Sequence, residues 1–326
     1  MKLQILIPQY KETDEIVKSL LDSIAIQQNI DFNDIGVIIC NDGTDIHLSN
    51  KLLNNYPFVI EYYLCEHKGV SATRNACLDH AIADYVMFCD ADDMFYTVFA
   101  LSTIFGYIDQ TFDFMYSVFI EEDRIPGFFV PIYTPIEKDA TFVHGKVYRR
   151  QYLIEKNIRW KEELVINEDS YFNSLCLGLS EKTIYCSVPF YVWKWREDSV
   201  SRDPQFMLKY FNNFIKSAET LVTEFLIHSR IDRAIYYTIH TIFYTYYTFN
   251  RLEWFLLENK EYKELTEKRF LEFYNKYGSY WNQMSDCDKI NISQEVRAIV
   301  VRDGMLMETI TIDDWLKRIK EHNLEN

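Results

Sequence analysis

The chain has 326 residues, of which 48% are hydrophobic, so it can bury a large core in one large domain with a smaller one, or in two domains. Its 34 basic and 49 acidic residues give a formal net charge of −15, which argues against nucleic acid or an anionic membrane surface as the partner. Nine glycines and seven prolines are too few for long flexible linkers.

The chain shows no pattern typical of a secretory signal or a membrane anchor. Its first apolar run ends at Pro8, which is too short for a signal-peptide core. Residues 234–250 contain no Asp, Glu, Lys or Arg, but they are rich in Thr and Tyr and predict a buried or interfacial helix rather than a membrane span. The seven cysteines form no C-x-x-C pair, which is typical of reduced core residues. These features predict a cytoplasmic protein, with peripheral attachment at the inner face of the membrane as the alternative.

Four short apolar runs near the N-terminus have the length and the β-branched and aromatic content of buried strands. They are residues 3–7, 36–40, 59–64 and 85–89. Helical patterns lie between them, one starting near residue 13 and another covering residues 71–83. The alternation of strand and helix predicts a parallel sheet with helices on both faces.

Polar residues follow three of these strands. They are residues 8–10, Asp42 and the cluster of Asp90, Asp92 and Asp93. Because the carboxyl ends of parallel strands share one edge, we expect these tips to converge on a ligand site. The chain has no G-x-G-x-x-G or G-K-[ST] loop to hold phosphates, so the clustered carboxylates predict a divalent cation instead, with a solvated Asp-rich turn as the alternative.

The segments ILIPQYKE, VIICNDGTD, HKGVSATRNACLDHA and YVMFCDADD together resemble the nucleotide-binding half of the GT-A glycosyltransferases. The resemblance is closest to family 2, the inverting enzymes with a D-x-D motif, and it covers roughly residues 1–202. It implies an α/β, Rossmann-like and mostly parallel sheet flanked by helices, in a domain of residues 1–203. The implied substrates are a UDP-sugar donor and a glycan or glycopolymer acceptor.

The same resemblance assigns the donor site. Pro8 and Tyr10 would pack the uracil, and Asp42 would accept its imide N–H, with a turn residue that caps its own backbone as the alternative. The family usually has two acidic residues where this chain has Asn41 and Asp42, which is a departure from the pattern. The full predicted donor-binding set is Pro8, Tyr10, Asp42, Lys68, Arg74, Asp90, Ala91 and Arg196.

Within that set, Arg74 and Lys68 would contact the phosphates or nucleoside, Asp90 the ribose, and Arg196 the diphosphate. Asp92 would be the ligand of Mn²⁺ or Mg²⁺. The physical need for a cation is clear, because two unit charges about 4 Å apart interact by about 4 kcal/mol at an effective dielectric constant near 20. A diphosphate beside three carboxylates would otherwise be repelled.

Glu168 and Asp169, followed by Phe172, match the family pattern E-D-x-x-[FY]. The resemblance makes Asp169 the general base that deprotonates the acceptor hydroxyl, and Glu168 a residue that orients the base or binds the acceptor. Asp169 could alternatively cap a helix, and in either case the helix dipole is expected to keep it ionised. His144 would contact the donor sugar or the acceptor, or else be structural.

Residues 204–326 have a helical pattern and carry no recognised motif. We expect this domain to recognise the acceptor or to hold subunits of an oligomer together. Two other functions stay open from the sequence. A nucleotidyltransferase of similar fold would need a Gly-rich, basic phosphate loop near residue 10, and a catalytically inactive nucleotide-sugar-binding module would lack some of the carboxylates named above.

Overall fold

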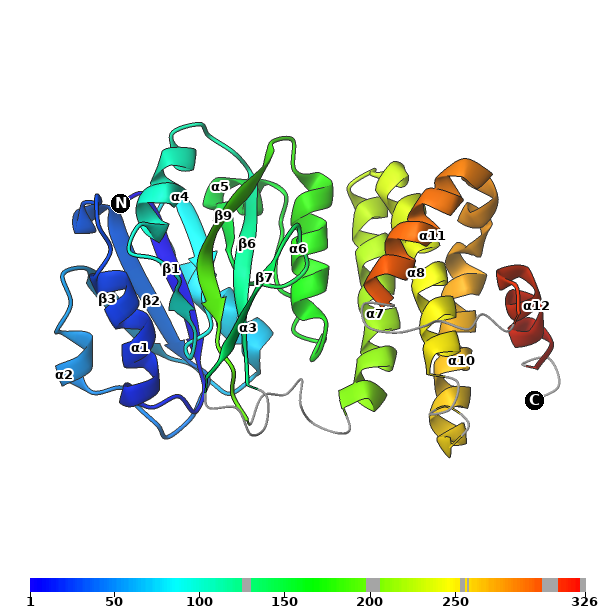
Figure 1. Cartoon of the computed structure of the whole chain (residues 1–326), viewed down its shortest axis with the longest axis horizontal. Coiled ribbons are helices and arrows are strands. Elements are labelled where there is room, and N and C mark those ends of the chain that lie inside the picture. The colour runs from blue at the N-terminus through cyan, green and yellow to red at the C-terminus, as the bar shows by residue number, and fades with distance from the viewer. Residues whose placement is uncertain (125–129, 198–205, 253–255, 257, 301–309, 323–326) are drawn as a thin grey trace. The chain divides into compact units, whose positions relative to one another are not determined.

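In the computed structural model, the described residues are 1–124, 130–197, 206–252, 256, 258–300 and 310–322. The chain divides into two compact units, Met1–Asp203 and Pro204–Asn326. The first unit combines strands and helices, and the second is helical (Figure 1). Among the described helices, none has both the length and the apolar character needed to cross a bilayer.

The four predicted N-terminal strands form one parallel block (Figure 1). They are β1 (Leu3–Gln9), β2 (Ile35–Asn41), β3 (Val59–Leu64) and β4 (Tyr85–Phe88). β1 pairs in parallel with both β2 and β4, and β2 pairs in parallel with β3. The carboxyl ends of these strands therefore lie at one edge of the sheet, as the sequence predicted.

Beyond β4 the sheet is mixed. Five later strands complete a nine-stranded sheet within the described residues: β5 (Met94–Phe95), β6 (Phe114–Asp123), β7 (Ile132–Ile136), β8 (Lys146–Arg149) and β9 (Thr183–Trp193). β8 is antiparallel to both β4 and β6, whereas β6 is parallel to β9. The predicted α/β fold with flanking helices is confirmed, but parallel pairing prevails only in its N-terminal half.

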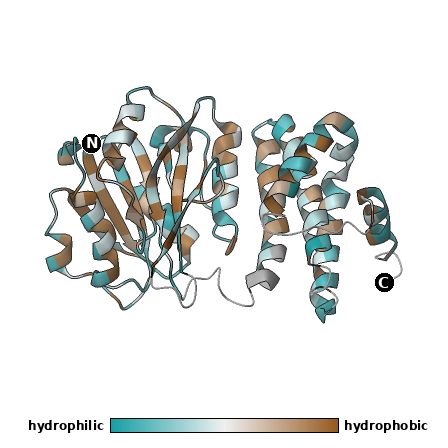
Figure 2. Ribbon diagram, viewed as in Figure 1, coloured by the Kyte–Doolittle hydropathy of each residue, from teal (hydrophilic) through white to brown (hydrophobic). Residues whose placement is uncertain are grey.

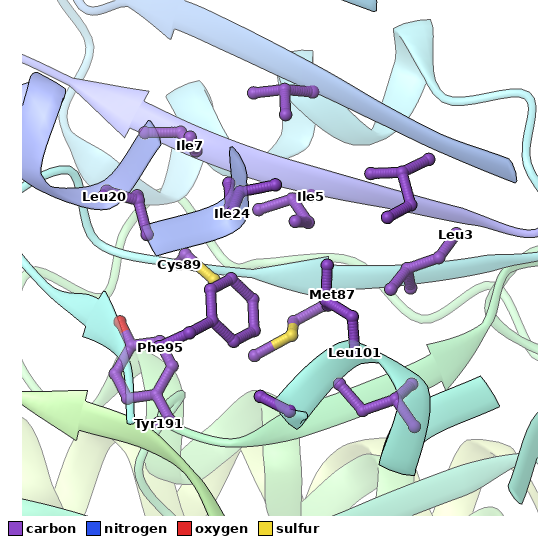
Figure 3. Close-up of a cluster of buried hydrophobic side chains, with 14 of the residues drawn as sticks. Leu3, Ile5, Ile7, Leu20, Ile24, Met87, Cys89, Phe95, Leu101 and Tyr191 are labelled. Atoms are coloured by element: carbon purple, nitrogen blue, oxygen red, sulfur yellow. The ribbon is translucent and has the colours of Figure 1, made fainter. Parts of the chain in front are cut away.

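One face of the parallel block is covered by α1 (Asp14–Ala25) and α4 (Ala100–Ile108). Ile5 of β1, Leu20 of α1 and Leu101 of α4 are fully buried in the cluster that these elements form (Figure 3). The strands of the block are hydrophobic along their length, whereas the helices carry mixed residues (Figure 2). β1, β2 and β4 are buried on both faces, as this pattern predicts, whereas β3 at the edge of the sheet is partly exposed.

The opposite face lies against α3 (Val70–His80) and α6 (Glu168–Leu179). Phe88 of β4 packs edge-on against Trp160 and Phe172, whose ring centroids are 5.1 and 5.9 Å from its own. Both helices begin at the carboxyl edge of the sheet, so their first turns contribute to the site described below. Three shorter helices of this unit are η1 (Phe32–Asp34), α2 (Asn50–Leu53) and α5 (Arg150–Glu155).

The second unit is a set of helices with an aromatic core. Its described elements are α7 (Phe206–Ile227), α8 (Ile231–Arg251), α10 (Lys260–Tyr277), η3 (Gly278–Gln283), α11 (Asp286–Val300) and α12 (Ile312–His322). Trp315 of α12 packs against Tyr246, Phe249 and Phe270, with ring centroids between 5.0 and 5.8 Å apart. These aromatic side chains are buried and stabilise the unit internally.

Candidate active site

The loops that follow β2 and β3 meet at the carboxyl edge of the sheet and hold Asp42. Asp42 is 5% exposed, and its Oδ1 accepts the backbone N–H groups of Lys68 (2.9 Å) and Gly69 (3.2 Å). Its Oδ2 accepts from the N–H of Gly69 (3.1 Å) and lies 3.0 Å from Nδ1 of His67. A carboxylate has about four acceptor positions, and three N–H groups of this loop reach Asp42, that of Gly69 being shared between both oxygens. These contacts hold the loop before α3 rather than the turn around Asp42 itself, and the contact with uracil stays a prediction.

Tyr10 and His67 form a stacked pair at the same edge. Their ring centroids lie 4.9 Å apart and their planes differ by 13°. Tyr10 is 39% exposed and follows β1, in which Pro8 still belongs to the strand. The side chain of Lys68 points into solvent and pairs with Glu66 at 3.0 Å, so its contact with the site in the described residues is its backbone N–H.

The acidic segment (residues 90–93) follows β4, and its three carboxylates have different partners. Asp92 is paired with Arg196, whose Nη1 is 2.9 Å from Oδ2 of Asp92 and 3.3 Å from Oε1 of Glu12. Burial and then the charge of Asp90 raise the pKa of Asp92, although Arg196 acts in the opposite direction. Arg196 therefore supplies positive charge at the place where the sequence predicted both a cation and a diphosphate contact.

Asp93 is buried beneath this surface. It accepts hydrogen bonds from the Tyr191 hydroxyl (2.6 Å) and from the backbone N–H of Lys194 (2.8 Å), and burial raises its pKa well above the usual range. Ala91 is also buried, with its side chain in the hydrophobic core. A contact between Ala91 and a donor would therefore have to come from its backbone.

His144 lies beside the acidic segment. Asp90, Asp93 and His144 each offer one ligand atom, and these atoms lie within 4.8 Å of one another. Nδ1 of His144 is buried, has no hydrogen-bond partner among the described residues, and lies 3.6 Å from Oδ2 of Asp93. Burial lowers the pKa of His144 to about 4, so its ring is neutral at pH 7 and keeps a lone pair. Two carboxylates and a neutral imidazole form a donor set that fits Mn²⁺.

Arg74 is buried between two carboxylates, and its predicted contact with the donor stays a prediction. It is 4% exposed, and its guanidinium lies 3.0 Å from Oδ1 of Asp90 and 3.1 Å from Oε1 of Glu168. Its guanidinium carbon lies 4.6 Å from the ring centroid of Trp160. Burial alone would lower the pKa of Arg74, but the two carboxylates raise it instead. Arg74 therefore joins the acidic segment to the start of α6.

Asp169 lies in the first turn of α6, which begins at Glu168, so Asp169 does not occupy the N-cap position that the sequence offered as the alternative. Oδ1 of Asp169 accepts the backbone N–H of Ser170 at 2.7 Å, and the helix is preceded by Asn167, whose side chain makes no capping bond. Burial, followed by the charge of Glu168, raises the pKa of Asp169 to about 8. The expectation that the helix dipole keeps this carboxyl ionised is therefore corrected, because desolvation outweighs the dipole here.

The structure thus places two sequence motifs in one site. The acidic segment and the pair Glu168–Asp169 are linked through Arg74, and the segment also contacts the end of β1 through Arg196 and Glu12. Sequence reasoning gave no role to Glu12, His67 or Trp160. The first two lie directly beside predicted strand ends, which is the signal that could have drawn attention to them.

A family model for glycosyl transferase family 2 matches residues 4–136. Glycosyltransferase GlyA of Streptococcus pneumoniae is 24% identical over 229 residues, which cover 62% of this chain and 32% of GlyA, so the chain spans about a third of that protein. The uncharacterized glycosyltransferase YibD of Escherichia coli is 22% identical over 350 residues, covering 99% of this chain and 95% of YibD.

Solved structures show the same fold. The crystal structure of S. aureus TarS 1–349 in complex with UDP-GlcNAc matches with a TM-score of 0.67 at 17% sequence identity, covering 93% of this chain and 91% of that one. The complex of TarS 1–349 with UDP matches with a TM-score of 0.63 at 16% identity, covering 95% and 94%. Together with the motifs at the sheet edge, these matches show that residues 4–136 are similar to glycosyl transferase family 2 and that the first unit has the GT-A fold.

Proposed function

We propose that this enzyme transfers a sugar from a UDP-sugar to a hydroxyl group of a glycan or glycopolymer acceptor, with inversion at the anomeric carbon and with the help of Mn²⁺ or Mg²⁺. The observation that carries the proposal is the link through Arg74. A single guanidinium contacts Asp90 and Glu168, so the acidic segment and the predicted catalytic pair belong to one site. The TarS complexes with UDP and UDP-GlcNAc support a uridine nucleotide as the donor.

Asp169 is the proposed general base. In an inverting transfer, the acceptor oxygen attacks the anomeric carbon from the face opposite UDP, so one base is sufficient. Asp169 would take the proton of that hydroxyl through the carboxylate oxygen that does not bind the N–H of Ser170. The carboxyl of Glu168, fixed by Arg74, would orient the acceptor beside it.

The acidic segment is the proposed place of the cation. Asp90, Asp93 and His144 form a donor set that fits it, and Asp92 joins that set if Arg196 turns from it toward the diphosphate. A bound divalent cation would neutralise the diphosphate and stabilise the leaving UDP. The predicted donor-binding residues would hold the UDP-sugar, while Arg196 would supply a second positive charge close to its diphosphate.

The function is tested by incubating the protein with UDP-sugars and Mn²⁺ in the absence of acceptor and measuring the UDP released. We expect slow hydrolysis of at least one UDP-sugar. Release of pyrophosphate from a nucleoside triphosphate would instead support the nucleotidyltransferase. Tight binding of UDP-sugars with no release of UDP, even when acceptors are added, would support the inactive binding module.

Asp92→Asn is expected to remove the metal dependence of UDP binding, because it deletes one of the carboxylates that the cation would neutralise. Isothermal calorimetry with Mn²⁺ and with EDTA measures this directly. The wild type should bind UDP more tightly with Mn²⁺, and the variant should bind it equally in both. Asp109→Asn makes the same charge change at an exposed position outside the site and should behave as the wild type.

The same titration shows whether the cation binds at Asp92 or in the cluster of Asp90, Asp93 and His144. His144→Gln removes the imidazole of the Asp90, Asp93 and His144 cluster but leaves Asp92 in place. Loss of the Mn²⁺ effect in His144→Gln would place the cation in that cluster. An unchanged Mn²⁺ effect in the Asp92→Asn variant would contradict the role of Asp92, and equal UDP affinity of the wild type with Mn²⁺ and EDTA would contradict the metal altogether.

The raised pKa of Asp169 predicts a pH dependence. A base acts only when it is ionised, so with a pKa of about 8 the value of kcat/KM should rise about tenfold per pH unit up to about pH 8 and then level off. Initial rates measured from about pH 6 to about pH 9.5 would show this rise in kcat/KM. The profile of Asp169→Asn should lack it. A wild-type profile that is flat over this range would contradict the assignment.

For the second unit, we propose a part in acceptor recognition or in holding subunits together. Its described aromatic side chains pack into its own core, so its contribution to a polymer site would come from its surface. Truncation after residue 203 is expected to leave UDP binding in place, because every donor residue named above precedes that point. Loss of UDP binding in the truncated protein would show that the units cooperate in donor binding.

A further inference from the structure

The helix that carries the proposed general base also carries a buried amide, one turn further along the chain. Asn173 follows Asp169 by four positions in α6, so the two side chains lie on the same face of the helix. The side chain of Asn173 is fully buried. Whatever holds this amide in place therefore also holds the face of α6 from which Asp169 would act.

The amide of Asn173 makes three hydrogen bonds. Its Nδ2 donates to the backbone oxygens of Thr141 (2.8 Å) and Phe142 (3.1 Å), and its Oδ1 accepts from the hydroxyl of Tyr148 (2.5 Å). A carbonyl oxygen can only accept a hydrogen bond, so the two backbone oxygens must face the NH₂ end of the amide. The side chain thus joins α6 to β8, through Tyr148, and to the segment that precedes β8.

That segment, residues 139–144, is called the histidine segment here because it ends at His144. At its start, Oδ1 of Asp139 accepts two backbone N–H groups of the segment, both at 2.9 Å. At its end, the backbone oxygen of His144 accepts a hydrogen bond from Nζ of the fully buried Lys146 at 2.9 Å. The ring of His144 lies 3.6 Å from Oδ2 of Asp93, on the side of the site where the donor is expected. The histidine segment is therefore fixed at both ends, and the buried amide ties its middle to α6.

We propose that Asn173 is a positioning residue that sets the distance between Asp169 and the donor side of the site. The inference rests on the proposed function, because it takes Asp169 as the base. In an in-line displacement the base and the leaving group lie on opposite sides of the anomeric carbon, and a displacement of about 1 Å can lower the rate about 100-fold. Arg74 joins the two sides through the carboxylates of Asp90 and Glu168, whereas Asn173 joins them through a backbone segment.

The test compares Asn173→Leu with Tyr148→Phe in the full chain. The probe reaction is the release of UDP, with Mn²⁺ and with water as the acceptor, from the UDP-sugar that the wild type hydrolyses fastest. Asn173→Leu frees the histidine segment from α6, so we expect it to lower kcat about 10–100-fold and to leave the UDP affinity, measured by calorimetry, within about threefold of the wild type. Tyr148→Phe keeps both bonds between the amide and the segment, and its kcat should stay within about threefold of the wild type.

Thermal unfolding separates this role from a general loss of stability. Both variants should unfold at a lower temperature than the wild type, because each leaves a buried polar partner unpaired. An equal fall of kcat in the two variants, or a wild-type kcat in folded Asn173→Leu, would overturn the role of Asn173.

Asn173→Asp keeps the size of the side chain and replaces Asn173→Leu if that variant does not fold. A carboxyl can donate at most one of the two bonds to the segment, so kcat should fall about tenfold or more, and an unchanged kcat would overturn the role. A wild type that releases no UDP from any UDP-sugar would instead overturn the proposed function.

Discussion

Replacing Asp169 with Asn is expected to lower turnover by about 10²–10⁴-fold, the usual contribution of a general base, while leaving the affinity for UDP unchanged. The amide fills nearly the same space as the carboxyl and can still accept the N–H of Ser170, so α6 should keep its first turn. It cannot take a proton from the acceptor hydroxyl. Steady-state rates with saturating donor and acceptor, alongside UDP calorimetry, measure the two quantities separately.

Glu162→Gln is the matched control for this variant. Glu162 is exposed in the segment before α6 and loses its charge in the same way, so the variant should keep near-normal turnover. Near-normal turnover of Asp169→Asn would remove Asp169 from the chemistry. A fall in UDP affinity that accounts for the whole loss of rate would instead make Asp169 a donor-binding residue.

The fold could be predicted where the sequence pattern is local. β1, β2 and β4 are continuous apolar runs because both of their faces are buried, and their ends coincide with the polar tips to within two residues. The later strands could not be predicted in the same way. β8 pairs with β4 and β6, and β6 pairs with β9, so their places depend on contacts between segments far apart in the chain.

The candidate site, too, could be predicted from the sequence only in part. Motif matching selected residues that do lie together, including Arg74, Asp90 and Glu168, but it did not indicate which of them pair. Arg74 and Glu168 are 94 positions apart in the chain, and only the folded structure shows that the guanidinium is buried between carboxylates. The raised pKa of Asp169 also depends on burial by neighbours, which no local pattern reports.

Arg74→Met is expected to destabilise the first unit by about 3–5 kcal/mol, the usual cost of removing one partner from a buried ion pair. The methionine can replace the packing on Trp160, but it leaves the carboxylates of Asp90 and Glu168 without their cation. For a domain of about 200 residues, the loss corresponds to a fall in Tm of about 10 °C. Thermal and urea unfolding of the purified variant measure it.

Arg159→Met is a matched comparison on the surface. Arg159 binds Asp79 with both partners partly exposed to solvent, and such pairs contribute about 0–1 kcal/mol to the free energy of unfolding. The Tm of the Arg159→Met variant should therefore change little. Adding Glu168→Gln to the Arg74→Met variant should restore part of the lost stability, because it removes one of the two unpaired charges. Equal stability of the Arg74→Met and Arg159→Met variants would show that Arg74 is not a buried link.

The pH dependence of the Arg74→Met variant identifies the cause of its instability. The pKa of Glu168 is already raised by burial in the presence of Arg74, and loss of the guanidinium should raise it further. A carboxyl whose pKa is higher in the folded than in the unfolded state stabilises the fold below its unfolded pKa, and this stabilisation is lost as the pH rises through the folded value. The stability deficit of the variant should therefore be smallest at about pH 5 and should grow toward about pH 8. A deficit that is independent of pH would indicate lost packing against Trp160 instead of unpaired charge.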